Sequence, residues 1–280
     1  MKNSPSENSP LIHYYDTHPI NEQEIYAKLK ARGDDLNGLT QAQLKDFDQD
    51  HYGGTDAVDV LADAAHIDVS SKVLDVCSGM GGPARWLAFT RGCSVTGLDL
   101  TRSRVESARN LSAAVGLSHR VQFEEGNACA MPFGDAQFDV VIGQEAWVHI
   151  PDKTALISEC RRVLKPGGYL SFTDIVERSA MLKGELAKMA DEMQFAQIFR
   201  PADYHQELKS HGFQLMVTED LSERWTQILQ GRLQMYCSLR DTTVARFGQA
   251  HHDHWERMYG AFVGLYVQGK MGGLRILARA

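Results

Sequence analysis

Short apolar runs alternate with helical stretches between residues 72 and 178 of the chain. Runs rich in valine, leucine and isoleucine that are closed by turn residues predict buried strands. The predicted strands are residues 73–76, 94–98, 120–124, 138–142 and 169–176. The predicted helices between them are residues 83–89, 102–115 and 154–164. Such alternation is typical of βαβ units with right-handed crossovers, so this segment is expected to form a mainly parallel sheet.

The segments on either side of this core are mostly helical in pattern. Residues 1–68 are predicted to form a polar tail and a helical arm, and residues 69–178 are predicted to form the core. Residues 179–280 predict a helical cap that also supplies the last two strands, at 213–217 and 274–278. We therefore expect an α/β protein with a doubly wound, seven-stranded, mostly parallel sheet.

The composition is that of a globular protein with an acidic surface. The chain has 280 residues, of which 43% are hydrophobic and 23% charged, and its formal net charge is −7. An acidic surface repels polyphosphate and anionic lipid, so neither nucleic acid nor a membrane is the expected partner. The five cysteines form no CxxC pair, which favours reduced thiols in a cytoplasmic protein. The polar start of the chain does not resemble a signal peptide, and no apolar run is long enough to span a bilayer.

A glycine-rich loop follows the first predicted strand. The segment Gly79-Met80-Gly81-Gly82-Pro83-Ala84 satisfies G-x-G-x-x-A, and glycines let a ligand approach the main chain. The free N–H groups at the start of the next helix are expected to attract an anion. Asp75 ends the strand, where a carboxylate suits a cationic group and opposes a diphosphate. Asp99 ends the second strand, where an acid accepts hydrogen bonds from ribose hydroxyls, so the pattern predicts a ligand with a nucleoside.

These motifs together resemble class I S-adenosylmethionine-dependent methyltransferases. Asp75 to Gly81 resembles the D-x-G-x-G-x-G loop of that family, with Cys77 in place of the first glycine, which cysteine tolerates if residue 77 has a negative φ. Gly126-Asn127-Ala128 is similar to the G-D-A segment that meets the adenine. The segments 138–145 and 162–168 resemble the signatures of the fourth and fifth strands. The resemblance implies a Rossmann-like fold and S-adenosylmethionine as cofactor, with S-adenosylhomocysteine as product. The residues it implies for cofactor binding are Asp75, Cys77, Gly79, Gly81, Asp99, Leu100, Asn127, Ala128, Gln144 and Tyr52.

A narrower likeness is carried by three segments. His51-Tyr52-Gly53-Gly54, the loop at residues 77–85 and the stretch from Gln144 to Lys153 together resemble sarcosine/dimethylglycine N-methyltransferases. The same pattern occurs in relatives that act on phosphoethanolamine and on prenyl carbon acceptors. The resemblance therefore implies methylation of a small molecule, with an amine nitrogen as the favoured acceptor. O- or C-methylation of another small metabolite, including prenyl and natural-product acceptors, is the alternative.

Three residues are candidates for catalysis. Glu145 and His149 follow the fourth predicted strand, at the edge where open α/β sheets bind their ligands. An amine attacks as the free base, so either residue fits a general base. A helix-starting carboxylate and a structural histidine are the alternatives for these two residues. His51 lies beside the Gly53-Gly54 turn, in the arm that the resemblance places over the cofactor.

Other side chains carry weaker indications. Arg85, one turn into the loop helix, is expected to reach the methionine carboxylate or to lie at the surface. Trp147 is expected in the core, with a π face toward a cationic amine as the alternative. The aromatic C-terminal helices are expected to pack on the sheet, with some rings over a pocket. The histidines of residues 251–254 do not share one helix face, so no metal site is expected.

Two other functions use the same kind of loop. An NAD(P)-dependent oxidoreductase is disfavoured by Asp75 and by the lack of a recognisable pair of residues for hydride transfer. A non-catalytic module that senses the adenosyl ligand does not require the enclosed acceptor pocket that the aromatic C-terminal helices indicate. The sequence thus favours a methyltransferase with a small-molecule acceptor, and it leaves open both the acceptor's identity and a homodimer.

Overall fold

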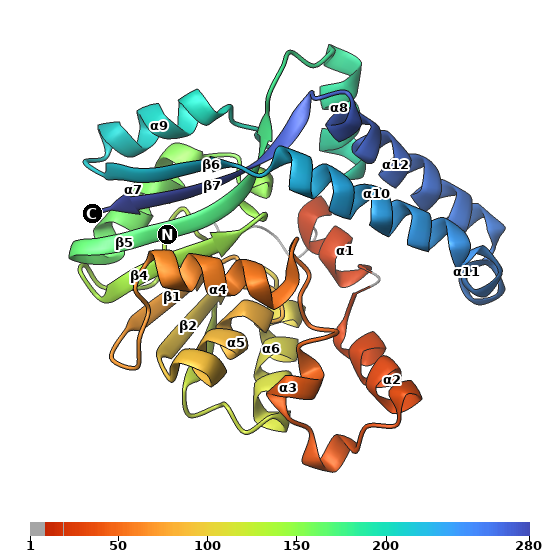
Figure 1. Cartoon of the computed structure of the whole chain (residues 1–280), viewed down its shortest axis with the longest axis horizontal. Helices are drawn as coiled ribbons and strands as arrows, with labels where there is room; N and C mark the ends of the chain where they lie inside the picture. The colour runs from red at the N-terminus through yellow and green to blue at the C-terminus, as the bar shows by residue number, and fades with distance from the viewer. Residues whose placement is uncertain (1–8, 19) are drawn as a thin grey trace.

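A seven-stranded sheet forms the centre of the computed structural model, which describes residues 9–18 and 20–280 (Figure 1). The strands are β1 (Lys72–Val76), β2 (Ser94–Asp99), β3 (Val121–Glu125), β4 (Phe138–Gln144), β5 (Leu164–Glu177), β6 (Gln214–Asp220) and β7 (Met271–Arg279). Their order across the sheet is β3-β2-β1-β4-β5-β7-β6, and β7 runs antiparallel to both β5 and β6, whereas the other pairs are parallel. The predicted fold class is confirmed. The largest boundary error is in β5, which begins at Leu164 rather than at the predicted residue 169.

Helices cover both faces of the sheet (Figure 1). On one face lie α4 (Gly54–Ala64), α5 (Gly82–Arg91) and α6 (Arg102–Ala114), and on the other lie α7 (Lys153–Val163) and α9 (Pro201–Ser210). Successive residues of a strand point to opposite faces. Val73 and Val140 therefore pack with α4, α5 and α6, while Leu74 and Val141 pack with α7 and α9. Both faces being buried explains why these strands read as continuous apolar runs.

The remaining helices form an N-terminal arm and a C-terminal cap. The arm contains α1 (Pro10–Asp16), α2 (Glu22–Arg32), the 3-10 helix η1 (Leu36–Gly38) and α3 (Gln41–Leu44). The cap contains α8 (Lys183–Glu192), α10 (Ser222–Ser238), α11 (Arg240–Phe247) and α12 (Gln249–Val267). The predicted polar tail falls mostly on residues 1–8, outside the described residues. Arm and cap contact each other: the rings of Tyr52 and Trp225 lie 4.9 Å apart, and Arg246 donates to Glu24 over 2.9 Å.

The parallel strands determine where a ligand fits. The carboxyl ends of β1, β2 and β4 meet at one edge of the sheet, and the arm and cap lie beside that edge (Figure 1). A short 3-10 helix, η2 (Trp147–His149), follows β4 at the same edge. Of the helices in the described part of the chain, none combines the length and apolar character needed to cross a membrane.

Candidate active site

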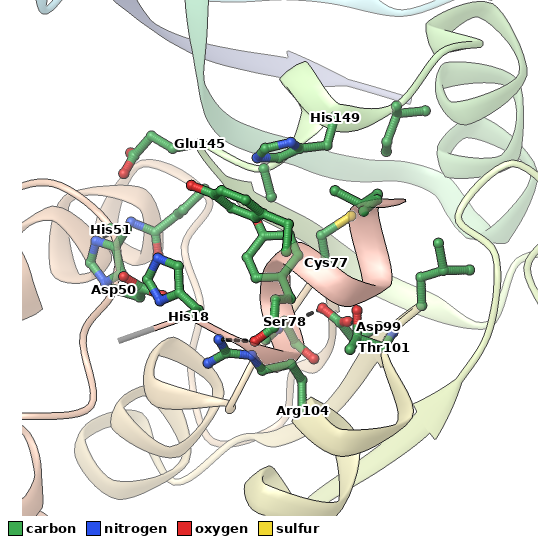
Figure 2. A pocket seen from close by; sticks show the side chains of 18 of the residues that line it. His18, Asp50, His51, Cys77, Ser78, Asp99, Thr101, Arg104, Glu145 and His149 are labelled. Atoms are coloured by element: carbon green, nitrogen blue, oxygen red, sulfur yellow. Dashed lines mark hydrogen bonds and ion pairs between the residues drawn. The ribbon is translucent and has the colours of Figure 1, made fainter. Parts of the chain in front are cut away.

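A cavity of about 400 Å³ opens at this edge between the sheet, the arm and the cap. All residues predicted for catalysis and cofactor binding line it except Gly81. Figure 2 shows His149 and Glu145 on one side of the cavity and Cys77, Ser78 and Asp99 on the other. The sequence motifs, although spread over about 100 residues of chain, are thus brought to one place. That they carry catalysis and cofactor binding stays a prediction.

The glycine loop gives the cavity its floor. Gly79 has φ +52°, and a Cβ added to it would meet no atom within 4 Å, so open space begins at its backbone. Gly81 has φ +75°, and a Cβ there would lie 2.4 Å from the ring of Phe123. Gly81 is therefore needed for packing beneath the loop rather than for contact with a ligand.

The expectation of a negative φ at Cys77 is wrong. Its φ is +65°, in the left-handed region that favours glycine. Two hydrogen bonds hold this turn, from the N–H groups of Cys77 and Ser78 to the carbonyl oxygen of Leu98, at 2.8 and 3.0 Å. The surrounding structure thus imposes on a cysteine a backbone conformation that costs about 1–2 kcal/mol in an L-residue with a Cβ.

Two carboxylates face the cavity beside this loop. Asp75 is 2% exposed, and its Oδ2 has no hydrogen-bond partner among the residues that the structure describes. Burial and then the charge of Asp99 raise the pKa of Asp75 to about 7. Asp99 accepts hydrogen bonds from the N–H groups of Gly79 and Thr101, at 2.8 and 2.9 Å, while burial raises its pKa. A ligand that brings a cationic group and hydroxyls would stabilise both carboxylates in their ionised form.

The same geometry is unfavourable for a diphosphate. The two carboxylates repel it, and the carbonyl oxygen of Asp48 approaches the start of α5 so closely that a Cβ added to Gly82 would lie 2.2 Å from it. Gly82 and Pro83 still line the cavity, so the expectation that the free N–H groups of this helix attract an anion stays a prediction. The contact between the arm and Gly82 is not revealed by the local sequence pattern.

Asn127 and its neighbours form a further wall of the cavity. The side-chain oxygen of Asn127 accepts from the N–H of Cys129 over 2.8 Å, which fixes the orientation of the amide. A second lone pair on that oxygen remains for a ligand. Leu100 and Ala128 add apolar surface to the lining, as an aromatic base requires.

His149 is a partly buried, neutral imidazole. Its Nδ1 lies 3.0 Å from the carbonyl oxygen of Gln194, so Nδ1 carries the hydrogen and Nε2 keeps its lone pair. Burial lowers its pKa to about 4. The rings of Tyr15 and Phe195 lie 5.5 and 5.4 Å from the imidazole. This arrangement supplies a proton acceptor in an aromatic surrounding.

Glu145 joins the arm to the sheet. It directly follows β4 with φ +54°, and its carboxylate accepts from the N–H of Tyr52 over 2.5 Å and from the hydroxyl of Thr173 over 2.7 Å. Burial raises its pKa to about 7. Glu145 does not start a helix, because η2 begins at Trp147.

His51 connects the arm to β4. Its Nε2 lies 2.8 Å from the Gln49 side-chain oxygen, and its Nδ1 lies 3.1 Å from the Gln144 side-chain nitrogen. Burial lowers the pKa of His51 to about 4, so the ring is neutral. With both ring nitrogens engaged, His51 is better suited to fix Gln49 and Gln144 than to exchange a proton.

Several lining residues have no signature in the sequence. They are His18, Asp50, Thr101, Arg104, Met193, Phe195 and Arg232. Tyr14, Tyr15, Trp255, Tyr259 and Phe262 also line the cavity, so part of the aromatic C-terminal segment lies over the pocket, as expected. Apart from Thr101 and Arg104 at the start of α6, these side chains come from the arm and the cap, and no fixed spacing relates them to the glycine loop.

Arg232 is the cation of the cap that reaches the cavity. It donates to the carbonyl oxygen of His51 over 2.8 Å, and its guanidinium lies 4.9 Å from the ring of Tyr52. Among the described residues, no carboxylate lies within ion-pairing distance of it. Its charge is thus available to an anionic group in the cavity.

Three sequence candidates lie outside the cavity. Arg85 is fully buried, pairs with Asp48 at 2.9 Å and donates to the carbonyl oxygen of Met80 at 2.6 Å, so it neither reaches the cavity nor lies at the surface. Trp147 is fully buried and stacks on Phe172 at 4.3 Å, which is the core position expected. Residues 251–254 contribute to no group of metal-ligating side chains in the described chain.

Comparison with known proteins agrees with this geometry. The family model of the methyltransferase domain matches residues 74–172. A glycine/sarcosine/dimethylglycine N-methyltransferase of Actinopolyspora halophila is 34% identical over 194 residues, which cover 68% of this chain and 34% of the relative. The methyltransferase GfsG of Streptomyces halstedii is 37% identical over 162 residues, which cover 53% of this chain and 58% of the relative. This chain thus spans less than two thirds of each relative.

The fold has a close counterpart among solved structures. A putative sarcosine dimethylglycine methyltransferase from Galdieria sulphuraria aligns with a TM-score of 0.74, over 92% of this chain and 97% of that one. At 19% sequence identity, this likeness concerns the fold alone. With the glycine loop, the acid at the end of β2 and the family match over residues 74–172, this chain belongs to the S-adenosylmethionine-dependent methyltransferases.

Proposed function

We propose that the protein transfers the methyl group of S-adenosylmethionine to a nitrogen of a small amine. One observation carries the proposal: a single cavity has a buried and a partly buried carboxylate, Asp75 and Asp99, that favour a cation and hydroxyls at one end, and a neutral imidazole at the other. The similarity to a glycine/sarcosine/dimethylglycine N-methyltransferase supports the amine as acceptor.

The residues present suit the cofactor. The unpartnered Oδ2 of Asp75 would accept from the ammonium group, and the carboxylate of Asp99 would accept from the ribose hydroxyls. Asn127, Ala128 and Leu100 would contact the adenine. When bound, the cofactor supplies a methyl group on a positively charged sulfur. The protein's part is to align the acceptor with that methyl group and to exclude water.

The acceptor end of the cavity suits an amine in its free-base form. Aromatic walls at Tyr14, Tyr15 and Phe195 disfavour full hydration of an ammonium ion. The nitrogen lone pair forms the new C–N bond, and the electrons of the broken C–S bond stay on sulfur. A secondary amine then loses a proton, which Nε2 of His149 accepts, whereas a tertiary amine gives a quaternary product with no proton to lose. The aromatic faces favour that cationic product.

Arg232 indicates which group the acceptor carries besides its amine nitrogen. A cation with no carboxylate partner within ion-pairing distance in the described residues suits an acceptor with a carboxylate or another acidic group. The predicted acceptor is therefore an amino acid or a similar amphoteric amine. Replacing Arg232 by methionine is expected to raise the KM of an acidic acceptor and to leave the affinity for the cofactor unchanged.

A second candidate function rests on the aromatic lining. Trp255, Tyr259 and Phe262 from the cap, together with the arm's tyrosines, also suit a larger apolar acceptor methylated on oxygen or carbon. An acceptor of this kind does not need the charge of Arg232. Its turnover is expected to be insensitive to the Arg232 substitution.

Calorimetry and thermal denaturation with S-adenosylhomocysteine and NADH test the cofactor. Binding of the adenosyl ligand is expected to raise the melting temperature by mass action, and Asp99→Ala is expected to abolish the shift. Asp241→Ala, on the exposed surface of α11, is the matched control. Protection by NADH alone would contradict the proposal. Incubation with labelled methyl donor and a panel of amines, acids, phenols and prenyl phosphates then identifies the acceptor. The absence of methylation across the whole panel would favour a non-catalytic module that senses the adenosyl ligand.

Three further statements stay predictions from the sequence. They are the domain limits at residues 1–68, 69–178 and 179–280, the homodimer and the cytoplasmic location. Size-exclusion chromatography with light scattering measures the oligomeric state and thereby tests the homodimer directly.

A further inference from the structure

A buried polar trio lies behind the cavity, between β5, α7 and α9. Lys153 and Asp174 form an ion pair at 2.7 Å, and the hydroxyl of Tyr204 lies 2.9 Å from Lys153 Nζ and 2.5 Å from Asp174 Oδ2. All three residues are 0% exposed. A buried ion pair gives little net stability compared with apolar residues of the same volume, so stability alone does not explain the trio.

The trio is connected to η2 through one backbone segment. The second carboxylate oxygen of Asp174 accepts from the N–H of Val148 over 3.2 Å. The carbonyl oxygen of Val148 accepts from the N–H groups of Ala196 and Gln197, at 3.0 and 3.2 Å. Both the N–H and the carbonyl group of Val148, the residue directly before His149 in the chain, are thus hydrogen-bonded.

His149 is then fixed by its own bond to the same loop. Its Nδ1 donates to the carbonyl oxygen of Gln194, two residues before Ala196. The backbone of η2 and the imidazole are thus attached to residues 194–197, while Asp174 anchors η2 to the sheet. The ring consequently points toward the cavity, as Figure 2 shows.

We infer that Lys153, Asp174 and Tyr204 are positioning residues that hold η2 so that Nε2 of His149 faces the methyl acceptor. The catalytic part of this inference rests on the proposed function, whereas the structural part does not. Lys153 neutralises the carboxylate of Asp174. The hydroxyl of Tyr204 donates to Oδ2, the oxygen that pairs with Lys153, so Oδ1 stays directed at the N–H of Val148. None of the three touches the cavity, so they act only through His149.

Loosening this anchor has a defined consequence for His149. The groups that face the imidazole are Tyr14 and Tyr15 from α1, His18 from the segment after α1, Phe195 from the loop, and Lys153 and Asp174 from behind. Burial is the main cause of the lowered pKa of His149, ahead of the opposing charges of Asp174 and Lys153. Water that reaches a loosened ring would therefore raise the pKa toward its ordinary value.

The test uses Tyr204→Phe in the full chain, with Tyr169→Phe as matched control. Tyr169 lies on β5, as Asp174 does, but does not line the cavity. Long-range ¹H–¹⁵N spectra of the histidine rings, assigned with His149→Gln, report the tautomer and the pKa of His149 without any substrate. Tyr204→Phe is expected to raise this pKa and to mix the two tautomers, while Tyr169→Phe leaves both unchanged.

Steady-state kinetics supply the second readout. Misplacement of His149 is expected to lower kcat for a secondary amine on the order of 10- to 100-fold, with the KM for the methyl donor unchanged. Asp174→Asn weakens both the ion pair with Lys153 and the hydrogen bond from the N–H of Val148. It is therefore expected to change the His149 titration and kcat more than Tyr204→Phe does. A Tyr204→Phe protein with a lower melting temperature but the wild-type His149 titration would overturn the inference. A wild type with no turnover would refute the proposed function instead, because the spectra do not depend on it.

Discussion

Replacement of Arg85 by methionine tests how the arm is attached to the glycine loop. Arg85 and Asp48 are each fully buried in their side chains and pair at 2.9 Å. The Arg85 guanidinium also donates to the carbonyl oxygen of Met80, within the loop itself, over 2.6 Å. The substitution would keep the apolar stem but leave the carboxylate of Asp48 buried without its cation.

The structure determines the size of the expected effect. Removing one partner of a buried ion pair destabilises a protein by roughly 3–5 kcal/mol, because the remaining charge is left desolvated. That is a large part of the roughly 5–15 kcal/mol that stabilises a typical domain. Arg91 on the same helix is the matched control, since it pairs at the surface with Asp59 and Asp63 at 3.2 and 2.8 Å. Arg91→Met is expected to change the free energy of unfolding by at most about 1 kcal/mol.

Urea unfolding followed by tryptophan fluorescence gives the free energy of unfolding of both variants. Calorimetry gives their affinity for S-adenosylhomocysteine, which reports on the glycine loop. Arg85→Met is expected to weaken this binding as well, since it releases Met80. Adding Asp48→Asn to Arg85→Met is expected to recover most of the lost stability, because it removes the uncompensated charge. Equal effects of Arg85→Met and Arg91→Met on the free energy of unfolding would refute the reasoning.

Three further predictions concern residues of the cavity. Cys77→Gly is expected to raise the free energy of unfolding by about 1 kcal/mol, since glycine adopts φ +65° without strain, and an unchanged or lower melting temperature would contradict this. Asp75→Asn is expected to stabilise the ligand-free protein more at pH 8 than at pH 5, as measured by urea unfolding at both pH values. The folded-state pKa of Asp75 is raised from 3.8 to about 7, so the folded state binds more protons and the wild type loses stability as pH rises through this window. His149→Gln is expected to slow methylation of a secondary amine roughly 10²- to 10⁴-fold in single-turnover assays and to affect a tertiary amine little, so equal losses would argue against a general base.

Local sequence determined much of the fold and the cofactor half of the site. Buried parallel strands require continuous apolar runs, so β1, β2, β4 and β5 could be located from the chain, although β5 starts earlier than predicted. The approximate positions of β3, β6 and β7 were also predicted. Asp75 and Asp99 lie in the last two residues of strands that pair in parallel, and parallel strands end at the same edge. Their proximity therefore follows from the pattern alone.

Contacts between distant segments were decided only by the tertiary structure. Arg232 lies about 180 residues from His51, whose carbonyl oxygen it binds, and no spacing rule relates the two. The same holds for Arg85, which local reasoning directed at a ligand and which instead neutralises Asp48 of the arm. The positive φ of Cys77 is imposed by hydrogen bonds to β2 that override the preference of the residue itself. Hydrophobic periodicity acts over a few residues and is written in the sequence, whereas the pairing of buried charges and the packing of arm, cap and sheet exist only once the chain has folded.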